Sequence, residues 1–116
     1  MFDKEYIMTV NIAGRHITIS DHNRQHIEAA LESFTKYQLD ITTVNVVVSE
    51  VKNGVNVEFD MHIAHANPVV INQSDKDLDT AIDLAIERAT KALRRLHDRV
   101  ISHGNESLKD LEIAEA

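Results

Sequence analysis

Apolar residues recur at every third or fourth position in the last third of the chain, which is the spacing of one face of an α-helix. This apolar stripe consists of Leu78, Ile82, Ala85, Ala89, Leu93, Leu96 and Val100. It predicts one long amphipathic helix over about 75–101, packed on a core along the stripe. Ser74 is in position to cap the N-terminus of this helix, with Asp77 as the acidic residue of a capping box.

The middle of the chain has the alternating and β-branched patterns of strands. Residues 55–64 alternate between apolar and polar side chains, which predicts a strand with one buried and one solvated face. Shorter β-prone runs predict three further strands, at 8–13, 44–51 and 69–71. Tight turns are expected at 14–16, 52–54 and 66–68, the second of them on an Asn-Gly pair, the strongest hairpin signal in the chain.

A second helix is predicted between the first two strands. Ser20 is a favourable N-cap for a helix over 21–37, and its buried stripe consists of Ile27, Ala30, Leu31 and Phe34. The resulting order of elements is β-α-β-β-β-α. It predicts an α+β two-layer sandwich, in which a four-stranded, mostly antiparallel sheet carries both helices on one face.

A chain of 116 residues is long enough for one domain with a modest core. We place this domain at 8–102, after an N-terminal overhang of residues 1–7 and before an acidic flexible tail of residues 103–116. No apolar run approaches the roughly 18 residues of a membrane-spanning helix, and the N-terminus lacks the basic start and apolar core of a secretory signal. With no cysteine in the chain, these features favour a cytoplasmic protein that does not contact a membrane.

Charge is divided along the long helix. Residues 75–87 contain five acids and one base, whereas residues 88–101 contain one acid and five bases. A structural interpretation is available, because acids near the start and bases near the end of a helix complement its macrodipole. The pairs Asp75/Asp79 and Asp79/Asp83 are accordingly expected to be first-turn carboxylates rather than an acid–base couple.

The bases also suggest a binding surface. On a helical wheel Arg88, Lys91, Arg95 and Arg99 form one row, here called the basic ridge, about 120° from the apolar stripe, and Arg94 stands further out. Neighbouring like charges repel one another, so a purely structural helix would gain by alternating signs. The ridge is therefore a candidate site for a polyanion, on a chain whose net charge of −7 otherwise argues against nucleic-acid binding.

Enzyme chemistry has no clear basis in this sequence. There is no cysteine, and with only three glycines there is no phosphate-binding loop or nucleophile elbow. His22 and His26 are four residues apart on a predicted helix, but no third metal ligand accompanies them. His62 and His65 are expected on opposite faces of a strand. We therefore expect no catalytic residue, metal, cofactor or small-molecule substrate.

Three segments resemble a known family. They are TVNIAGRHITIS near the N-terminus, the strand VNVVVSEV, and DLDTAIDLAIERATKALRRLHDR in the long helix. The chain is thereby similar to the short ribosome hibernation factors, bacterial proteins of the sigma-54 modulation and ribosome-associated inhibitor family. The similarity covers about residues 8–103 and is most specific at Asp77–Asp83, which resembles the family's D-M-Y-x-A-I-D segment, with Asp79 in place of Tyr.

The resemblance implies a fold similar in layout to a double-stranded-RNA-binding domain. It also implies binding to the small ribosomal subunit and the 70S ribosome, in the decoding channel, where the protein overlaps the mRNA and tRNA sites and silences translation in stress or stationary phase. Basic side chains would contact phosphates of 16S rRNA. Matched by position, these are Arg24 on the first helix and Arg88, Lys91, Arg95 and Arg99 on the second, and Arg94 beside the ridge completes the candidate set.

Two other functions stay open. The family's older name suggests a protein–protein regulatory module acting on the transcription machinery, whose binding would survive salt and would not depend on the ridge. An enzyme or metal-binding domain built on the histidines would co-purify with a metal. Relatives usually carry lysines on the first helix where this chain has Ala30 and Ser33, a difference that bears on affinity rather than on fold.

Overall fold

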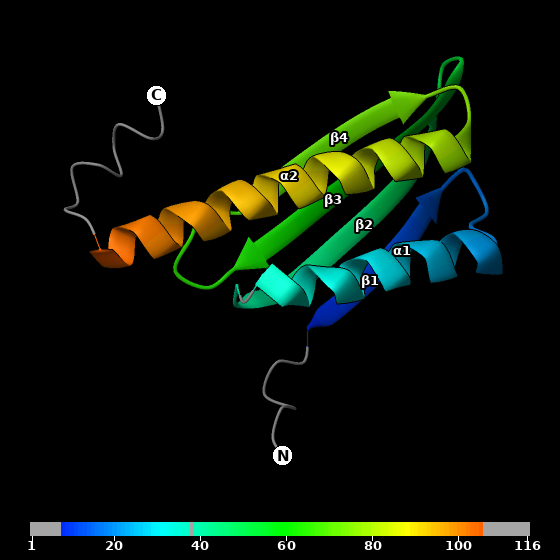
Figure 1. Cartoon of the computed structure of the whole chain (residues 1–116). Coiled ribbons are helices and arrows are strands. Elements are labelled where there is room, and N and C mark those ends of the chain that lie inside the picture. Colours follow the sequence, from blue (N-terminus) through cyan, green and yellow to red (C-terminus); the bar gives the residue numbers. More distant parts are fainter. Residues whose placement is uncertain (1–7, 38, 106–116) are drawn as a thin grey trace.

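The computed structural model describes residues 8–37 and 39–105, so the predicted overhang and most of the predicted tail lie outside the described residues. The elements follow the predicted order (Figure 1): β1 Thr9–Arg15, α1 Asp21–Ser33, the 3₁₀ helix η2 Phe34–Tyr37, β2 Ile41–Val51, β3 Gly54–Ile63, β4 Val69–Asp75 and α2 Leu78–Asn105. Among the helices so described, none is both long enough and apolar enough to cross a membrane.

The strands form one mixed sheet in the order β1-β2-β3-β4. β1 pairs with β2 in parallel, and the other two pairings are antiparallel. Both helices lie on the same face of the sheet and begin at the same end of it, α2 across β3 and β4 and α1 beside β1 (Figure 1). The predicted α+β sandwich with a mostly antiparallel sheet is confirmed.

The core lies between the sheet and the two helices. The stripe predicted for α1 is buried at Ile27, Leu31 and Phe34, and the stripe of α2 is buried from Ile82 to Leu93. They pack on alternate residues of the central strands, and the largest of the fully buried side chains there are Val44, Val46, Val48, Val57, Phe59 and Met61. Because strand side chains alternate between faces, the residues between them form the open face of the sheet, which is polar in β3.

The predicted start of the long helix was wrong. Ser74 belongs to β4, where its Oγ donates to Oδ1 of Asn56 in β3 at 2.9 Å. The cap is Asp77, whose Oδ2 accepts the backbone N–H and the hydroxyl of Thr80 at 3.0 Å each, and α2 begins at Leu78. Strand pairing outweighs the capping preference of serine here, because β4 extends to Asp75 alongside β3. At its other end α2 continues to Asn105, beyond the expected 101.

The first strand also extends further than the sequence suggests. Gly14 was expected in a turn but lies in β1, which pairs with β2 as far as Arg15. The left-handed residue is His16, with φ 60°. A side chain at position 14 would place its Cβ 2.4 Å from the backbone O of Ile17. Glycine is therefore needed here because the backbone at Ile17 passes too close for any side chain. The first helix, predicted to 37, finishes as the tighter helix η2, a frequent ending for α-helices.

Candidate nucleic-acid interface

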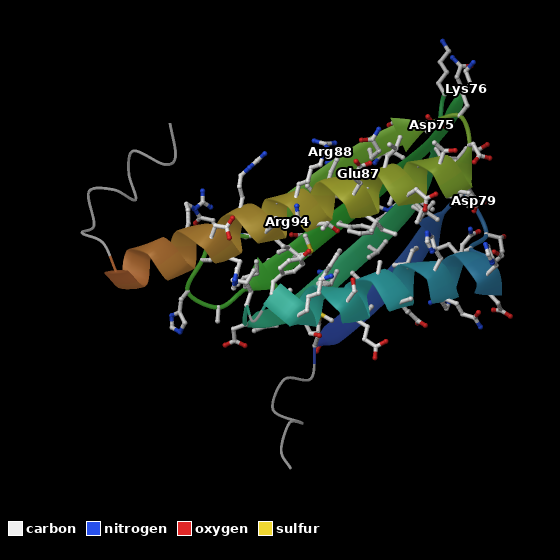
Figure 2. The ribbon with its side chains drawn as sticks, viewed as in Figure 1. Asp75, Lys76, Asp79, Glu87, Arg88 and Arg94 are labelled. Carbon is white, nitrogen blue, oxygen red and sulfur yellow. The ribbon has the colours of Figure 1, made fainter. Side chains whose placement is uncertain are left out.

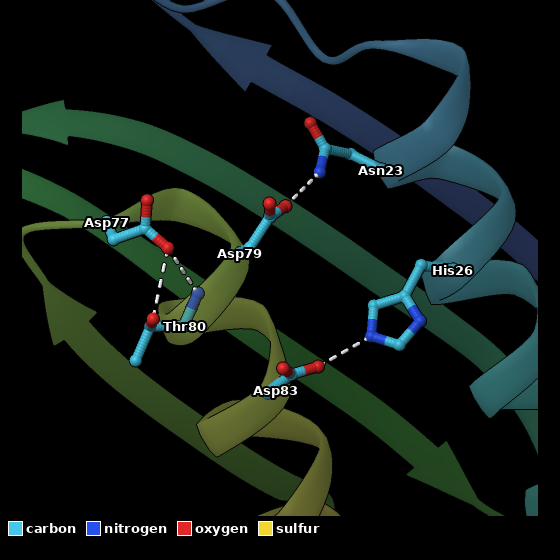
Figure 3. A network of polar contacts seen from close by, with 6 residues as sticks. All are labelled: Asn23, His26, Asp77, Asp79, Thr80 and Asp83. Carbon is cyan, nitrogen blue, oxygen red and sulfur yellow. Dashed lines mark hydrogen bonds and ion pairs between the residues drawn. The ribbon is translucent and has the colours of Figure 1, made fainter.

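Two contacts fix the first half of α2 against α1. Nδ2 of Asn23 donates to Oδ1 of Asp79 at 2.7 Å, and one turn later Nε2 of His26 lies 2.6 Å from Oδ1 of Asp83 (Figure 3). Asn23 is buried and is itself held by Ser20, whose Oγ accepts its backbone N–H and donates to its Oδ1. The carboxylates of Asp79 and Asp83 therefore join the two helices, a role that the sequence did not indicate.

The opposite side of α2 faces β4 and carries the basic ridge. Nη1 of Arg88 donates to the backbone O of Asn72 at 2.6 Å and to Oε1 of Gln73 at 3.2 Å, both in β4. Figure 2 shows Arg88 on this side of the helix. The other ridge residues follow at helical spacing and lie on the same side. Arg88 is thus anchored to the sheet through Nη1, while its exposed guanidinium keeps further N–H donors.

The remaining bases of α2 differ in their pairing. Nζ of Lys91 lies 3.6 Å from Oε2 of Glu87, an exposed pair of the kind that contributes little to stability. Arg94 and Arg95 are exposed and make no hydrogen bond or ion pair with any described residue. Arg99 is half-buried. The guanidinium groups of Arg94 and Arg95, which project about 100° apart round the helix, are therefore both open to a ligand.

Arg24 does not join this surface. It lies on α1 two residues before His26, about 200° round the helix, and His26 faces α2. Arg24 is consequently exposed on the side of α1 away from α2, whereas the ridge is on the side of α2 away from α1. Arg24 and the ridge therefore form two separate surfaces at opposite borders of the helical layer.

The helix arrangement decides how far the macrodipole explains the charges. Since α1 and α2 begin at the same end of the sheet (Figure 1), Asp21 and Asp79 in their first turns lie at two positive dipole ends. Arg94 and Arg95 precede the end of α2 at Asn105 by more than two turns, and the dipole effect falls off within the last turn. The structural interpretation therefore accounts for Asp21 and Asp79 but not for these two arginines. Asp75 and Asp83, also expected in the first turn of the long helix, lie in β4 and in the second turn of α2.

The structure brings together one group that the sequence reasoning did not connect. Tyr37 at the end of η2 lies beside His97 of α2, with ring centroids 6.4 Å apart, and Nζ of Lys36 lies 5.5 Å from the centroid of the tyrosine ring. The only feature of the sequence that bears on this contact is that His97 lies off the apolar stripe, about 100° from Leu96. Its neighbour across the helical layer depends on how α1 ends.

Arg88 provides a test of the division between structural and binding bases. We expect Arg88→Leu to lower the free energy of unfolding by about 0.5–1.5 kcal/mol, because two hydrogen bonds to β4 are lost. The control Lys91→Leu, which removes only an exposed ion pair, should change it by less than about 0.5 kcal/mol. Urea unfolding of both variants measures the difference, and equal stabilities would contradict the anchoring role of Arg88.

No cluster of three or more histidine, aspartate or glutamate side chains suited to a metal ion occurs in the part of the chain that the structure describes. His62, expected on the opposite strand face from His65 and not to act with it, lies 3.4 Å from Asp60 on the open face of β3. His65 is in the following turn, with φ 66°.

Comparison with known sequences identifies relatives of the whole folded part. The model of the family described as sigma 54 modulation protein / S30EA ribosomal protein matches residues 10–101. The chain is 28% identical over 94 residues to the ribosome hibernation promoting factor of Azotobacter vinelandii, a match that covers 81% of this chain and 87% of the relative. It is 30% identical over 104 residues to the ribosome-associated factor Y of Haemophilus influenzae, covering 89% of this chain and 96% of the relative.

Solved structures give the same answer for the fold. The N-terminal domain of Thermus thermophilus Protein Y superposes with a TM-score of 0.67 at 26% identity, covering 78% of this chain and 99% of the domain. A ribosomal subunit interface protein from Coxiella burnetii superposes with a TM-score of 0.68, covering 77% of this chain and 97% of its own. The identity in the second case is 15%, so that comparison supports the fold alone.

Proposed function

The chain belongs to the sigma 54 modulation protein / S30EA ribosomal protein family, and on this basis we propose that it is a ribosome-associated hibernation factor. It binds the small ribosomal subunit in the cytoplasm, alone or within the 70S ribosome, and silences translation when growth is arrested. It acts without catalysis, by occupying its binding site on the small subunit. The names of both sequence relatives, a hibernation promoting factor and a ribosome-associated factor, support this function.

The observation that carries the proposal is the open pair Arg94 and Arg95. Two exposed guanidinium groups without partners among the described residues are available donors for phosphate oxygens, which arginine binds with two parallel hydrogen bonds. We propose that they contact 16S rRNA phosphates together with Lys91 and Arg99 along the ridge. Arg88 contributes its charge to the same surface from its position on β4.

The position of Arg24 fits an enclosed binding site. A flat RNA surface would meet only one border of the helical layer, so Arg24 and the ridge could not both contact it. The walls of a channel can meet both borders. We therefore propose that the folded domain fills the decoding channel, with Arg24 against one wall and the ridge against another, and thereby excludes mRNA and tRNA. Phosphate contacts of this kind fix position without reading base sequence.

The alternative of a protein–protein module acting on the transcription machinery makes a different prediction about salt. Binding through phosphate contacts releases counterions and weakens steeply as salt rises, by about a thousandfold between 50 and 200 mM for six contacts. Binding to a protein through apolar and neutral polar surface has a much weaker dependence.

Co-sedimentation with purified small subunits and 70S ribosomes across about 50 to 400 mM salt tests the proposal. We expect binding to the small subunit that is lost steeply over this range, as phosphate contacts require. Binding that persists at the highest salt, or no binding at the lowest, would contradict rRNA recognition by the basic surface. RNA polymerase in a parallel sedimentation provides the comparison for the alternative.

A further inference from the structure

Tyr37 is distinctive among the aromatic residues of this chain. The sequence contains three Phe, two Tyr and no Trp. Phe34 and Phe59 are fully buried, and Phe2 and Tyr6 lie outside the described residues. Among the described Phe and Tyr residues, Tyr37 is therefore the one that is only partly buried, packed against the edge of the core.

One cation and one further aromatic ring lie against Tyr37. The ammonium group of Lys36 lies over it at 5.5 Å from the centroid, and the imidazole of His97 stands beside it, tilted by 56°. Arg94 precedes His97 by three residues, so the two are neighbours on the surface of α2, and Figure 2 shows Arg94 on the border of the helix opposite Arg88, nearer α1. Lys36 and Arg94 are exposed and form no ion pair with a described residue.

A ligand that fits this patch combines a flat π-system with negative charge. An unpaired nucleotide of RNA has both, because every base presents a π-face and is flanked by two phosphates. A protein segment would have to supply an aromatic side chain and acidic residues at matching positions. The bound base takes the place of the Lys36 ammonium group on the ring, and the long, flexible lysine stem allows that group to move to a phosphate.

We propose that Tyr37 and His97 form a stacking platform for one unpaired base of RNA, with Lys36 and Arg94 binding the adjacent phosphates. This inference rests on the proposed function, since the partner is again ribosomal RNA, but it adds a contact of a different kind. The ridge recognises the backbone of RNA and is indifferent to pairing, whereas the platform requires a base that is not stacked in a helix. It therefore selects single-stranded positions.

Tyrosine fluorescence tests the platform directly. Because the chain has no Trp and only two Tyr, the variant Tyr6→Phe leaves Tyr37 as the only tyrosine and keeps all four residues of the proposed patch. It is titrated at one salt concentration with a single-stranded uridine hexamer and with a hexamer of equal charge whose central nucleotides are abasic. We expect quenching by the uridine hexamer, and an affinity for the abasic one lower by about 5- to 150-fold. Unchanged emission, or equal affinities, would overturn the proposal.

A second experiment separates this inference from the proposed function. Tyr37→Leu, shown to be folded by its thermal transition, should bind small subunits more weakly by a similar factor, and Tyr37→Phe, which keeps the ring, should restore the affinity. If Tyr37→Leu binds as the unsubstituted protein does while Arg95→Glu, which lies outside the patch, abolishes binding, the platform is refuted and the proposed function stands. If the unsubstituted protein does not bind ribosomes, the proposed function fails, and the hexamer titration still decides the platform.

Discussion

The double variant Arg94→Glu/Arg95→Glu is expected to lose association with the small ribosomal subunit. Both side chains are exposed and make no hydrogen bond or ion pair with the rest of the described chain, so each is available for a charge-assisted hydrogen bond worth about 1.5–3 kcal/mol. Removing two such bonds weakens binding by about 100-fold or more. Reversing the charge adds repulsion from the same phosphates. Co-sedimentation at low salt measures the loss.

The fold of this double variant should be unaffected. Neither arginine is part of the buried stripe of α2, and both precede the end of the helix at Asn105 by more than two turns, beyond the reach of the macrodipole effect. Exposed substitutions of this kind usually change the free energy of unfolding by no more than about 0.5 kcal/mol. A normal thermal transition together with lost ribosome binding would therefore assign the effect to the interface.

A matched control is available at the other end of the molecule. Lys52→Glu/Lys76→Glu makes the same change in net charge at two exposed lysines. Lys76 lies in the loop before α2, at the end of the domain remote from Arg94 (Figure 2). We expect the control to bind nearly normally. Equal losses in the two double variants would mean that overall charge, rather than the basic surface, governs association.

The sequence predicts most of the fold because the elements have strong local periodicity. The stripe of α2 has a spacing that only a helix places on one side, and it is buried from Ile82 to Leu93. The alternation of β3 likewise predicts which of its residues face the helices, including Phe59 and Met61. These patterns depend on neighbouring residues alone.

The errors occurred where long-range pairing decides the structure. Ser74 has the local character of a helix cap, but pairing with β3 keeps it in a strand. Gly14 has the local character of a turn residue, but pairing with β2 extends the strand past it. In both cases a ladder between segments far apart in the sequence outweighs a preference of one residue.

The candidate site shows the same division between local and long-range information. Periodicity predicts that Arg88, Lys91, Arg95 and Arg99 share one side of α2, but it contains no information on what lies beside that side. Arg88 binds β4 because the sheet order puts this strand at the border of the layer. Tyr37 and His97 meet because the two helices run in the same direction, which follows from the parallel pairing of β1 with β2.

Substitution of Gly54 gives the second large effect that we expect. It distinguishes two explanations for the glycine in the turn between β2 and β3. The sequence indicates an Asn-Gly hairpin turn, in which glycine would be needed for a left-handed backbone. In the structure the left-handed residue is Asn53, with φ 70°, and no glycine in the described chain has positive φ. Gly54 is instead the first residue of β3, where a Cβ would lie 2.4 Å from the backbone O of Asp75 at the end of β4.

Gly54→Ala should therefore destabilise the protein by about 3 kcal/mol, the upper part of the usual range for overpacking, because the atom that must yield belongs to the backbone of a paired strand. For a domain of this size the melting temperature should fall by roughly 10 °C or more. Gly54→Asn, which a left-handed position would tolerate, should be at least as damaging. Asn53→Gly is the control: glycine accepts the left-handed conformation at position 53, so its transition should move little. If Gly54→Asn were tolerated and Asn53→Gly damaging, the close approach of β4 would not be the reason for this glycine.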